Sequence, residues 1–175
     1  RHNTSMSLLL LDLDHFKTLN DTHGHPAGDR VLKAIGDLLK LEIRAEDVVA
    51  RYGGEEFAIL ARGISSNQTA LLAERLRESI ESLAVYWEDD ELRVTTSIGC
   101  ACWCAELLTG KAELIERADR ALYRAKGSGR NRVVLDCQVD EGERECQPEG
   151  FFEDEEGEGE TTLNVLKRMV LGTKK

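Results

Sequence analysis

The chain has 175 residues and a formal net charge of −10, with 33 acidic against 23 basic side chains. This length supports one ordinary globular domain with an appendage. The acidic average excludes a basic nucleic-acid binder, because phosphate-rich partners are normally met by clustered Lys and Arg. The longest strongly apolar run is the four leucines at 8–11, far short of the roughly twenty residues of a membrane span.

The acidic charge is concentrated in one stretch of the chain. Residues 138–160 hold eleven acidic residues and one basic residue, whereas residues 1–136 carry a net charge of only −4. A segment rich in Glu and Gly buries too little apolar surface to order itself. We therefore expect a folded domain over residues 1–136 and an acidic, flexible C-terminal tail over residues 137–175, in preference to a short helix at 163–170.

Apolar periodicity and turn residues predict helices and strands in mixed order. In chain order these are a strand at 7–13, helices at 14–21 and 26–43, strands at 48–52 and 57–61, a helix at 66–83, a strand at 92–104, a helix at 113–126 and a strand at 133–135. Gly53 and Gly54 are suited to a tight hairpin turn. Since strands and helices do not alternate strictly, the pattern favours an α+β sheet domain.

Five cysteines, an odd number without framework spacing, indicate reduced thiols and a cytoplasmic location for this stretch, whether or not a longer parent is membrane-tethered. Cys100, Cys102 and Cys104 alternate, so on a strand they would share one face. A metal site would need further ligands converging on them. Small, buried, apolar cysteines are the favoured interpretation.

Three clusters of residues carry candidate chemistry. Asp12 lies at the end of a buried strand. There its carboxylate and a neighbouring backbone carbonyl can ligate a hard cation. Glu55 and Glu56 follow two glycines at a hairpin tip, and such adjacent carboxylates repel each other unless a cation is bound. Lys126 and Arg130 flank a glycine-broken helix end suited to gripping phosphates.

Each cluster also has a purely structural explanation: a helix cap, an ordinary hairpin and a helix stop, respectively. The three clusters together offer acids for a metal, bases for phosphate and glycines for access, and all of them lie at the ends of helices or strands. A purely structural explanation of all three at once is therefore much weaker. Together they predict a Mg²⁺-nucleotide site with metal-assisted phosphoryl chemistry.

Three motifs in this order resemble the GGDEF family, the diguanylate cyclases, in its GGEEF form. The central motif reads Arg-Tyr-Gly-Gly-Glu-Glu-Phe at 51–57, and the flanking motifs lie at 12–29 and 118–131. The resemblance covers about residues 5–136. It implies an α+β fold with a central, mostly antiparallel sheet flanked by helices, similar to the palm of nucleotidyl cyclases.

The resemblance implies condensation of two GTP molecules into cyclic di-GMP with release of two pyrophosphates. The reaction would take place where two such domains meet face to face, and no nucleic acid or membrane contact is expected. A non-catalytic cyclic di-GMP or GTP receptor of the same fold is the alternative, and a scaffolding domain is a third. Intact Asp12, Lys17, Glu55 and Glu56 argue against the receptor, which has no need of two metal carboxylates.

The resemblance also implies roles for single residues. Asp12, the Leu13 carbonyl and Glu55 would bind Mg²⁺, with Mn²⁺ as an alternative and two ions per site, and Glu55, Glu56 and Lys17 would be catalytic. The substrate-binding residues would be Asn20, His25, Asp29, Gly54, Lys126 and Arg130. From the sequence alone, Asn20 and Asp29 could instead cap helices, and His25 could be a loop-packing residue.

A predicted inhibitory site precedes the hairpin. Arg44 and Asp47 have the spacing and position of the family's RxxD site, which binds the product cyclic di-GMP. An Arg and an Asp three residues apart at a helix end are common, so their position carries the prediction. Either Arg75 or Arg77 could complete this pocket.

Overall fold

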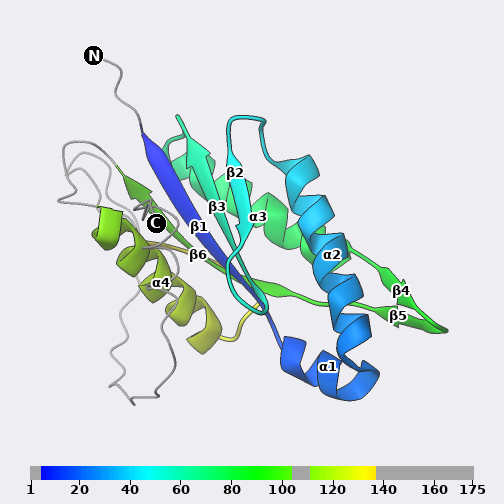
Figure 1. The fold of residues 1–175 in the computed structure, drawn as a ribbon. Helices are drawn as coiled ribbons and strands as arrows, with labels where there is room; N and C mark the ends of the chain where they lie inside the picture. The colour runs from blue at the N-terminus through cyan, green and yellow to red at the C-terminus, as the bar shows by residue number, and fades with distance from the viewer. Residues whose placement is uncertain (1–4, 104–110, 137–175) are drawn as a thin grey trace, which may run out of the picture.

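The computed structural model describes residues 5–103 and 111–136 (Figure 1). Cys104 and the predicted tail at 137–175 lie outside the described residues. The elements in chain order are β1 Met6–Leu13, α1 Phe16–His23, α2 His25–Glu42, β2 Val48–Arg51, β3 Glu56–Arg62, α3 Ser66–Ser82, β4 Val85–Trp87, β5 Asp90–Leu92, β6 Thr96–Trp103, α4 Lys111–Gly127 and β7 Val133–Asp136.

The main sheet has five strands in the order β2-β3-β1-β6-β7. Every neighbouring pair is antiparallel except β6 and β7, which run parallel. The predicted α+β fold with a mostly antiparallel sheet is therefore confirmed. Helices α2 and α3 cover one face of the sheet and α4 covers the other (Figure 1).

Strand β1 is central, so its side chains are buried on both faces. Leu9, Leu11 and Leu13 pack in the core cluster that includes α2 and α3, whereas Leu8 and Leu10 pack with residues of α4. This division follows from the two-residue period of a strand. By the same period, Asp12 falls on the face that α4 covers.

Helix α4 lies directly on the backbone of β6 at Gly99. A Cβ atom at this position would overlap the backbone nitrogen of Leu122 and the carbonyl oxygen of Ala118, which belong to successive turns of α4. Glycine is required here because backbone cannot move aside as a flexible side chain could. The contact fixes how closely α4 approaches the sheet.

The predicted single strand at 92–104 is wrong at its beginning. Leu92 belongs to β5, which pairs with β4 in a separate hairpin, and the sheet strand β6 begins only at Thr96. The chain reverses at Glu88, whose φ is 52°. Val85 and Leu92 are a cross-strand pair whose side chains are buried in the core cluster, and this burial holds the hairpin against the domain.

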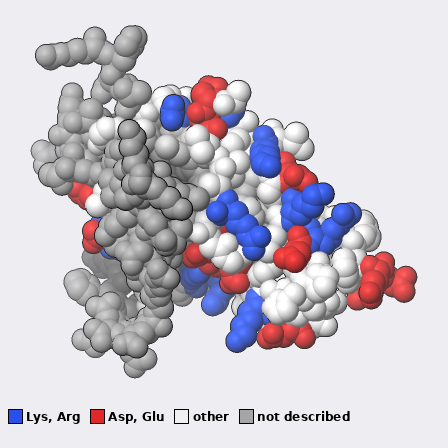
Figure 2. Space-filling view, viewed as in Figure 1, with Lys and Arg blue, Asp and Glu red and all other residues white. Residues whose placement is uncertain are grey.

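Charged side chains of both signs are interspersed over the face seen in Figure 2, with acidic ones at the projecting β4–β5 hairpin. Of the three predicted strand cysteines, Cys100 is fully buried and Cys102 is half-buried. None of the described helices is long and apolar enough to cross a membrane.

Candidate active site

The candidate site forms where β1 ends beside β3 and the last turn of α4. Asp12 lies opposite Glu56 of β3 and Ser97 of β6 in the sheet register. Asp12 is only 6% exposed. Lys126 reaches it from α4, with its Nζ 2.7 Å from Asp12 Oδ2. The structure thus joins the first and third predicted clusters directly, through an acid and a base 114 positions apart.

The two glutamates of the hairpin lie beside Asp12. The Leu13 amide donates to the Glu55 carbonyl at 3.2 Å, so the hairpin follows the end of β1. Burial, and then the negative charge of Asp12, raises the pKa of Glu55 and of Glu56. Burial also raises the pKa of Asp12, although Lys126 opposes the shift. These three carboxylates, which we call the carboxylate cluster, carry more negative charge than Lys126 balances.

The hairpin turn differs from the predicted one. Neither Gly53 nor Gly54 has a positive φ, as the tight two-residue turn would require. Instead the Tyr52 amide donates to the Glu56 carbonyl at 2.7 Å, and the Arg51 guanidinium donates to the Gly54 carbonyl at 2.7 Å. The prediction of a tight turn is therefore wrong, because Arg51 stabilises a wider one.

The two glycines serve different purposes. A Cβ atom on Gly53 would collide with the Glu56 carboxylate, so glycine here allows that side chain its position. A Cβ atom on Gly54 would meet nothing within 4 Å. Gly54 therefore borders open space, where a ligand can approach the backbone.

Asp14, only two residues beyond Asp12, has the opposite environment. Its carboxylate accepts hydrogen bonds from Ser97 Oγ at 2.6 Å, from Thr95 Oγ1 at 2.7 Å and from the Asn131 amide at 3.0 Å. Asp14 is therefore a structural acid that ties the loop after α4 to the sheet.

The predicted base-binding residues lie on α1 and α2. Asn20 Oδ1 is buried without a hydrogen-bond partner among the described residues, which is costly unless a ligand supplies a donor. Gly28 allows this arrangement, since a Cβ there would collide with Asn20 Oδ1. Asp29 and His25 are exposed on the first turns of α2. No helix cap involves the Asn20 or Asp29 side chain in the described hydrogen bonds of α1 and α2.

The two other predicted basic residues, Lys17 and Arg130, are both exposed. Lys17 is exposed in the first turn of α1. Arg130 is exposed in the loop after α4, and its charge lowers the pKa of Asp12 against the effect of burial. Cations at these positions are suited to a ligand that brings additional negative charge.

Asp119 also belongs to this neighbourhood, and the sequence analysis assigned it no role. Burial raises the pKa of Asp119, and its charge in turn raises the pKa of Glu56. Asp119 lies seven residues before Lys126, which is two helical turns, so both project from the same face of α4. That spacing is the signal that could have identified it.

Asp12, Glu55 and the Leu13 carbonyl have the chemistry of a magnesium site. Within residues 5–103 and 111–136 no three His, Cys, Asp or Glu side chains converge as a self-contained metal cage. Mg²⁺ is commonly held by one or two carboxylates together with substrate phosphates and water. The donors present therefore fit a cation that is bound jointly with a phosphorylated ligand.

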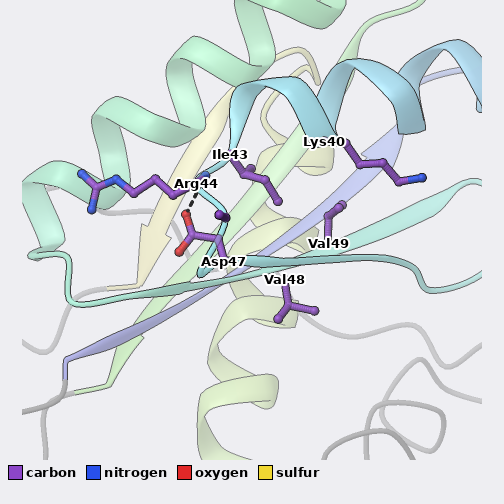
Figure 3. A pocket seen from close by; sticks show the side chains of 7 residues that line it. Lys40, Ile43, Arg44, Asp47, Val48 and Val49 are labelled. Carbon is purple, nitrogen blue, oxygen red and sulfur yellow. Dashed lines mark hydrogen bonds between the residues drawn. The ribbon is translucent and has the colours of Figure 1, made fainter.

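The predicted inhibitory residues lie at the far end of α2. Lys40, Ile43, Arg44, Asp47 and the start of β2 line an open hollow (Figure 3). The Asp47 carboxylate accepts the backbone amides of Arg44 at 3.2 Å and of Arg62 at 3.1 Å. The Arg44 guanidinium extends away from the hollow and is exposed (Figure 3).

The two candidate arginines of α3 differ in their contacts. The Arg75 guanidinium binds Glu42, donating to its carbonyl at 2.6 Å and pairing with its carboxylate at 3.1 Å, two residues before Arg44. Arg77 instead binds Glu74, Glu81 and Asn131 and leaves 12% of its side chain exposed. Of the two, Arg75 is the one held near the hollow.

The fold is that of a GGDEF domain, as comparison with solved structures shows. The GGDEF domain of DgcB from Caulobacter crescentus, solved with c-di-GMP, matches with a TM-score of 0.71 and 34% identity over 75% of this chain and 78% of that one. The active GGEEF domain of a diguanylate cyclase from Vibrio cholerae gives a TM-score of 0.70 and 30% identity over 77% and 85% of the two chains.

Sequence comparison agrees. Residues 1–132 match the family described as diguanylate cyclase, GGDEF domain. Diguanylate cyclase A of Treponema denticola is 42% identical over 131 residues, and diguanylate cyclase DgcP of Pseudomonas aeruginosa is 44% identical over 137 residues. These matches cover 75% and 77% of this chain but only 35% and 20% of the two relatives. The chain belongs to the GGDEF family of diguanylate cyclase domains, which confirms the resemblance.

Proposed function

We propose that this chain is a catalytic domain that condenses two GTP molecules into cyclic di-GMP and releases two pyrophosphates. The observation that carries the proposal is the carboxylate cluster with Lys126 and Arg130 beside it. A receptor that only bound the nucleotide would have no use for three crowded acids with raised pKa values. Relatives 42% and 44% identical are named diguanylate cyclases, which supports the same conclusion.

Asp12, Glu55 and the Leu13 carbonyl would hold Mg²⁺, or Mn²⁺, with Glu56 close to a second ion. A divalent cation would neutralise phosphate charge and polarise the α-phosphate. It would also offset the burial and the repulsion from Asp12 that raise the pKa values of Glu55 and Glu56. Because Lys126 contacts Asp12 directly, this lysine is placed to pass from the carboxylate to the phosphates when substrate and cation arrive.

The substrate would extend from the predicted base-binding residues of α1 and α2 to the basic residues beside the carboxylate cluster. Asn20 and Asp29 would recognise the guanine edge, since a carboxylate accepts both N1–H and N2–H of that base. Gly54 would border the nucleotide, and His25 would line the base pocket. Lys17, Lys126 and Arg130 would bind the triphosphate through charge-assisted hydrogen bonds.

In the reaction each 3′-hydroxyl attacks the α-phosphate of the other GTP. A new phosphodiester bond forms, the bond to the pyrophosphate group breaks, and the hydroxyl proton passes to a base. Glu55 or Glu56 would serve as this base, since both carboxylates lie in the carboxylate cluster beside the proposed cation. One domain offers one such site, so two copies would meet face to face to join two nucleotides.

The test is incubation with GTP and Mg²⁺, with cyclic di-GMP and pyrophosphate measured by chromatography. Glu55→Ala should abolish product, whereas Asp37→Ala, which removes an exposed acid of α2, should keep wild-type activity. Equal product from Glu55→Ala and wild type would contradict the metal assignment. Tight cyclic di-GMP binding without product, even at high protein concentration, would instead favour the receptor.

The Arg44–Asp47 hollow would bind the product and slow the enzyme. Arg75 is the preferred completing residue, because its contact with Glu42 keeps it beside this hollow. Arg44→Ala should weaken cyclic di-GMP inhibition about tenfold or more, as expected for loss of a charged hydrogen-bond donor. Initial rates at increasing product concentration measure the effect, and an unchanged inhibition constant would remove the hollow as the inhibitory site.

A further inference from the structure

The loop that carries Arg130 has an unfavourable backbone conformation. Gly129, Arg130 and Asn131 have consecutive φ values of 111°, 62° and 43°. Residues with a side chain seldom adopt positive φ, and such conformations persist only where the surroundings hold them. Something outside the loop must therefore keep Arg130 in place.

Part of this stabilisation comes from a hydrogen bond of the loop backbone. The Asn131 amide donates to Asp14 Oδ2 at 3.0 Å, and Asp14 is itself fixed by the hydroxyls of Thr95 and Ser97. These bonds anchor the end of the loop to the sheet. They leave the side chain of Asn131 free to bond elsewhere.

The side chain of Asn131 is held from α3. Its Oδ1 accepts a hydrogen bond from Arg77 Nη1 at 2.8 Å, and its Nδ2 donates to Glu81 Oε1 at 2.8 Å. Arg77 Nη1 also donates to Glu81 Oε2 at 2.6 Å. The three side chains therefore close a ring of hydrogen bonds that joins α3 to Asn131, which lies 50 positions after Glu81 and 54 after Arg77. The bonds from Arg77 and Asn131 lower the pKa of Glu81, which keeps it charged.

We propose that Arg77 and Glu81 are positioning residues for the nucleotide's phosphates, acting through Asn131 to hold Arg130 toward the carboxylate cluster. Neither residue touches the substrate. The inference rests on the proposed function, in which Arg130 binds the terminal phosphates. Arg130 lies close enough to the cluster for its charge to act on Asp12.

Two glutamates of α3 allow a matched test. Glu74 and Glu81 pair with Arg77 at 2.7 and 2.6 Å, and each leaves 46% of its side chain exposed. Only Glu81 also binds Asn131. The comparison of Glu81→Ala with Glu74→Ala therefore separates the contact with the loop from the surface ion pair.

The probe is the α,β-methylene analogue of GTP, which keeps all three phosphates and cannot release pyrophosphate. Glu81→Ala should weaken its binding about five- to tenfold, the usual effect of one charged hydrogen bond, and leave GMP binding unchanged. Glu74→Ala should change either affinity less than twofold. Hydrogen exchange at the amides of 129–131 should accelerate in Glu81→Ala alone.

Equal losses for the two variants, or equal losses of analogue and GMP binding, would overturn the proposal, because both indicate general disruption. Unchanged exchange in Glu81→Ala would overturn it too. Arg130→Ala separates the proposal from the proposed function. If Arg130→Ala binds the analogue like wild type, the phosphate role of Arg130 fails. If it binds weakly while Glu81→Ala binds normally, only the positioning role fails.

Discussion

Asp12 and Asp14 lie two residues apart at the end of β1, and both are almost fully buried, at 6% and 5% exposure. Asp14 accepts hydrogen bonds from two hydroxyls and a backbone amide, and these bonds stabilise the fold. Asp12 meets one lysine and two further acids with raised pKa values. Burial alone therefore does not distinguish a structural acid from a candidate functional one, whereas the hydrogen-bond donors around the carboxylate do.

The largest expected effect is at the functional acid. Asp12→Asn should reduce cyclic di-GMP formation at least about a hundredfold, because an amide cannot supply the charge that would bind the proposed cation and position the phosphates. Chromatographic assay of product measures the loss. The variant should unfold at or above the wild-type temperature, and activity within tenfold of wild type would erase the distinction between the two acids.

The next effect is at the structural acid. Asp14→Ala should lower the free energy of unfolding by about 3 kcal/mol, because it leaves two hydroxyls and the Asn131 amide without their acceptor in a buried site. Urea denaturation followed by circular dichroism measures this change. A loss below about 1 kcal/mol would mean that water replaces the carboxylate at little cost.

The smallest expected effect concerns how Glu56 changes the stability of the fold with pH. The pKa of Glu56 is raised in the folded chain, so its contribution to stability is present below the ordinary pKa of about 4.3 and is lost as pH rises through the folded value. Glu56→Gln should therefore raise Tm by roughly 2 °C at pH 8 without divalent cations. At pH 4 the gain should vanish.

Adding Mg²⁺ at pH 8 provides the control for this prediction. The cation should raise the Tm of wild type more than that of Glu56→Gln, because it relieves a repulsion that the variant has already lost. A variant less stable than wild type at pH 8 would show that Glu56 forms favourable contacts that outweigh the repulsion.

Much of the fold was predictable from local patterns. The apolar run at 7–13 predicted β1 to within one residue, and local patterns located the four helices found within residues 5–103 and 111–136. The β4–β5 hairpin was missed because strands of three residues carry too little alternation to be recognised. The hairpin turn at Gly53 was misjudged, since its shape depends on hydrogen bonds from Arg51.

The site was predictable as a set of residues but not as a set of contacts. Motifs and the resemblance identified Asp12, Glu55, Glu56 and Lys126 as a group. The role of Asp14 was not predictable, and for Asp119 the sequence offered only its helical spacing from Lys126. Asp14 depends on Asn131, 117 positions later, and Asp119 depends on which face of α4 meets the sheet. Such contacts follow from packing between distant segments, which local patterns do not encode.

The alternation of side chains between the two faces of β1 limits which sequence changes this strand can tolerate. Leucines face both layers of helices, so exchanging one apolar residue for another there alters packing only locally. Removing or adding a single residue before Asp12 would turn its carboxylate to the opposite face of the sheet, away from Lys126. The strand can therefore vary in composition but not in length, and deletions here should be far less tolerated than substitutions.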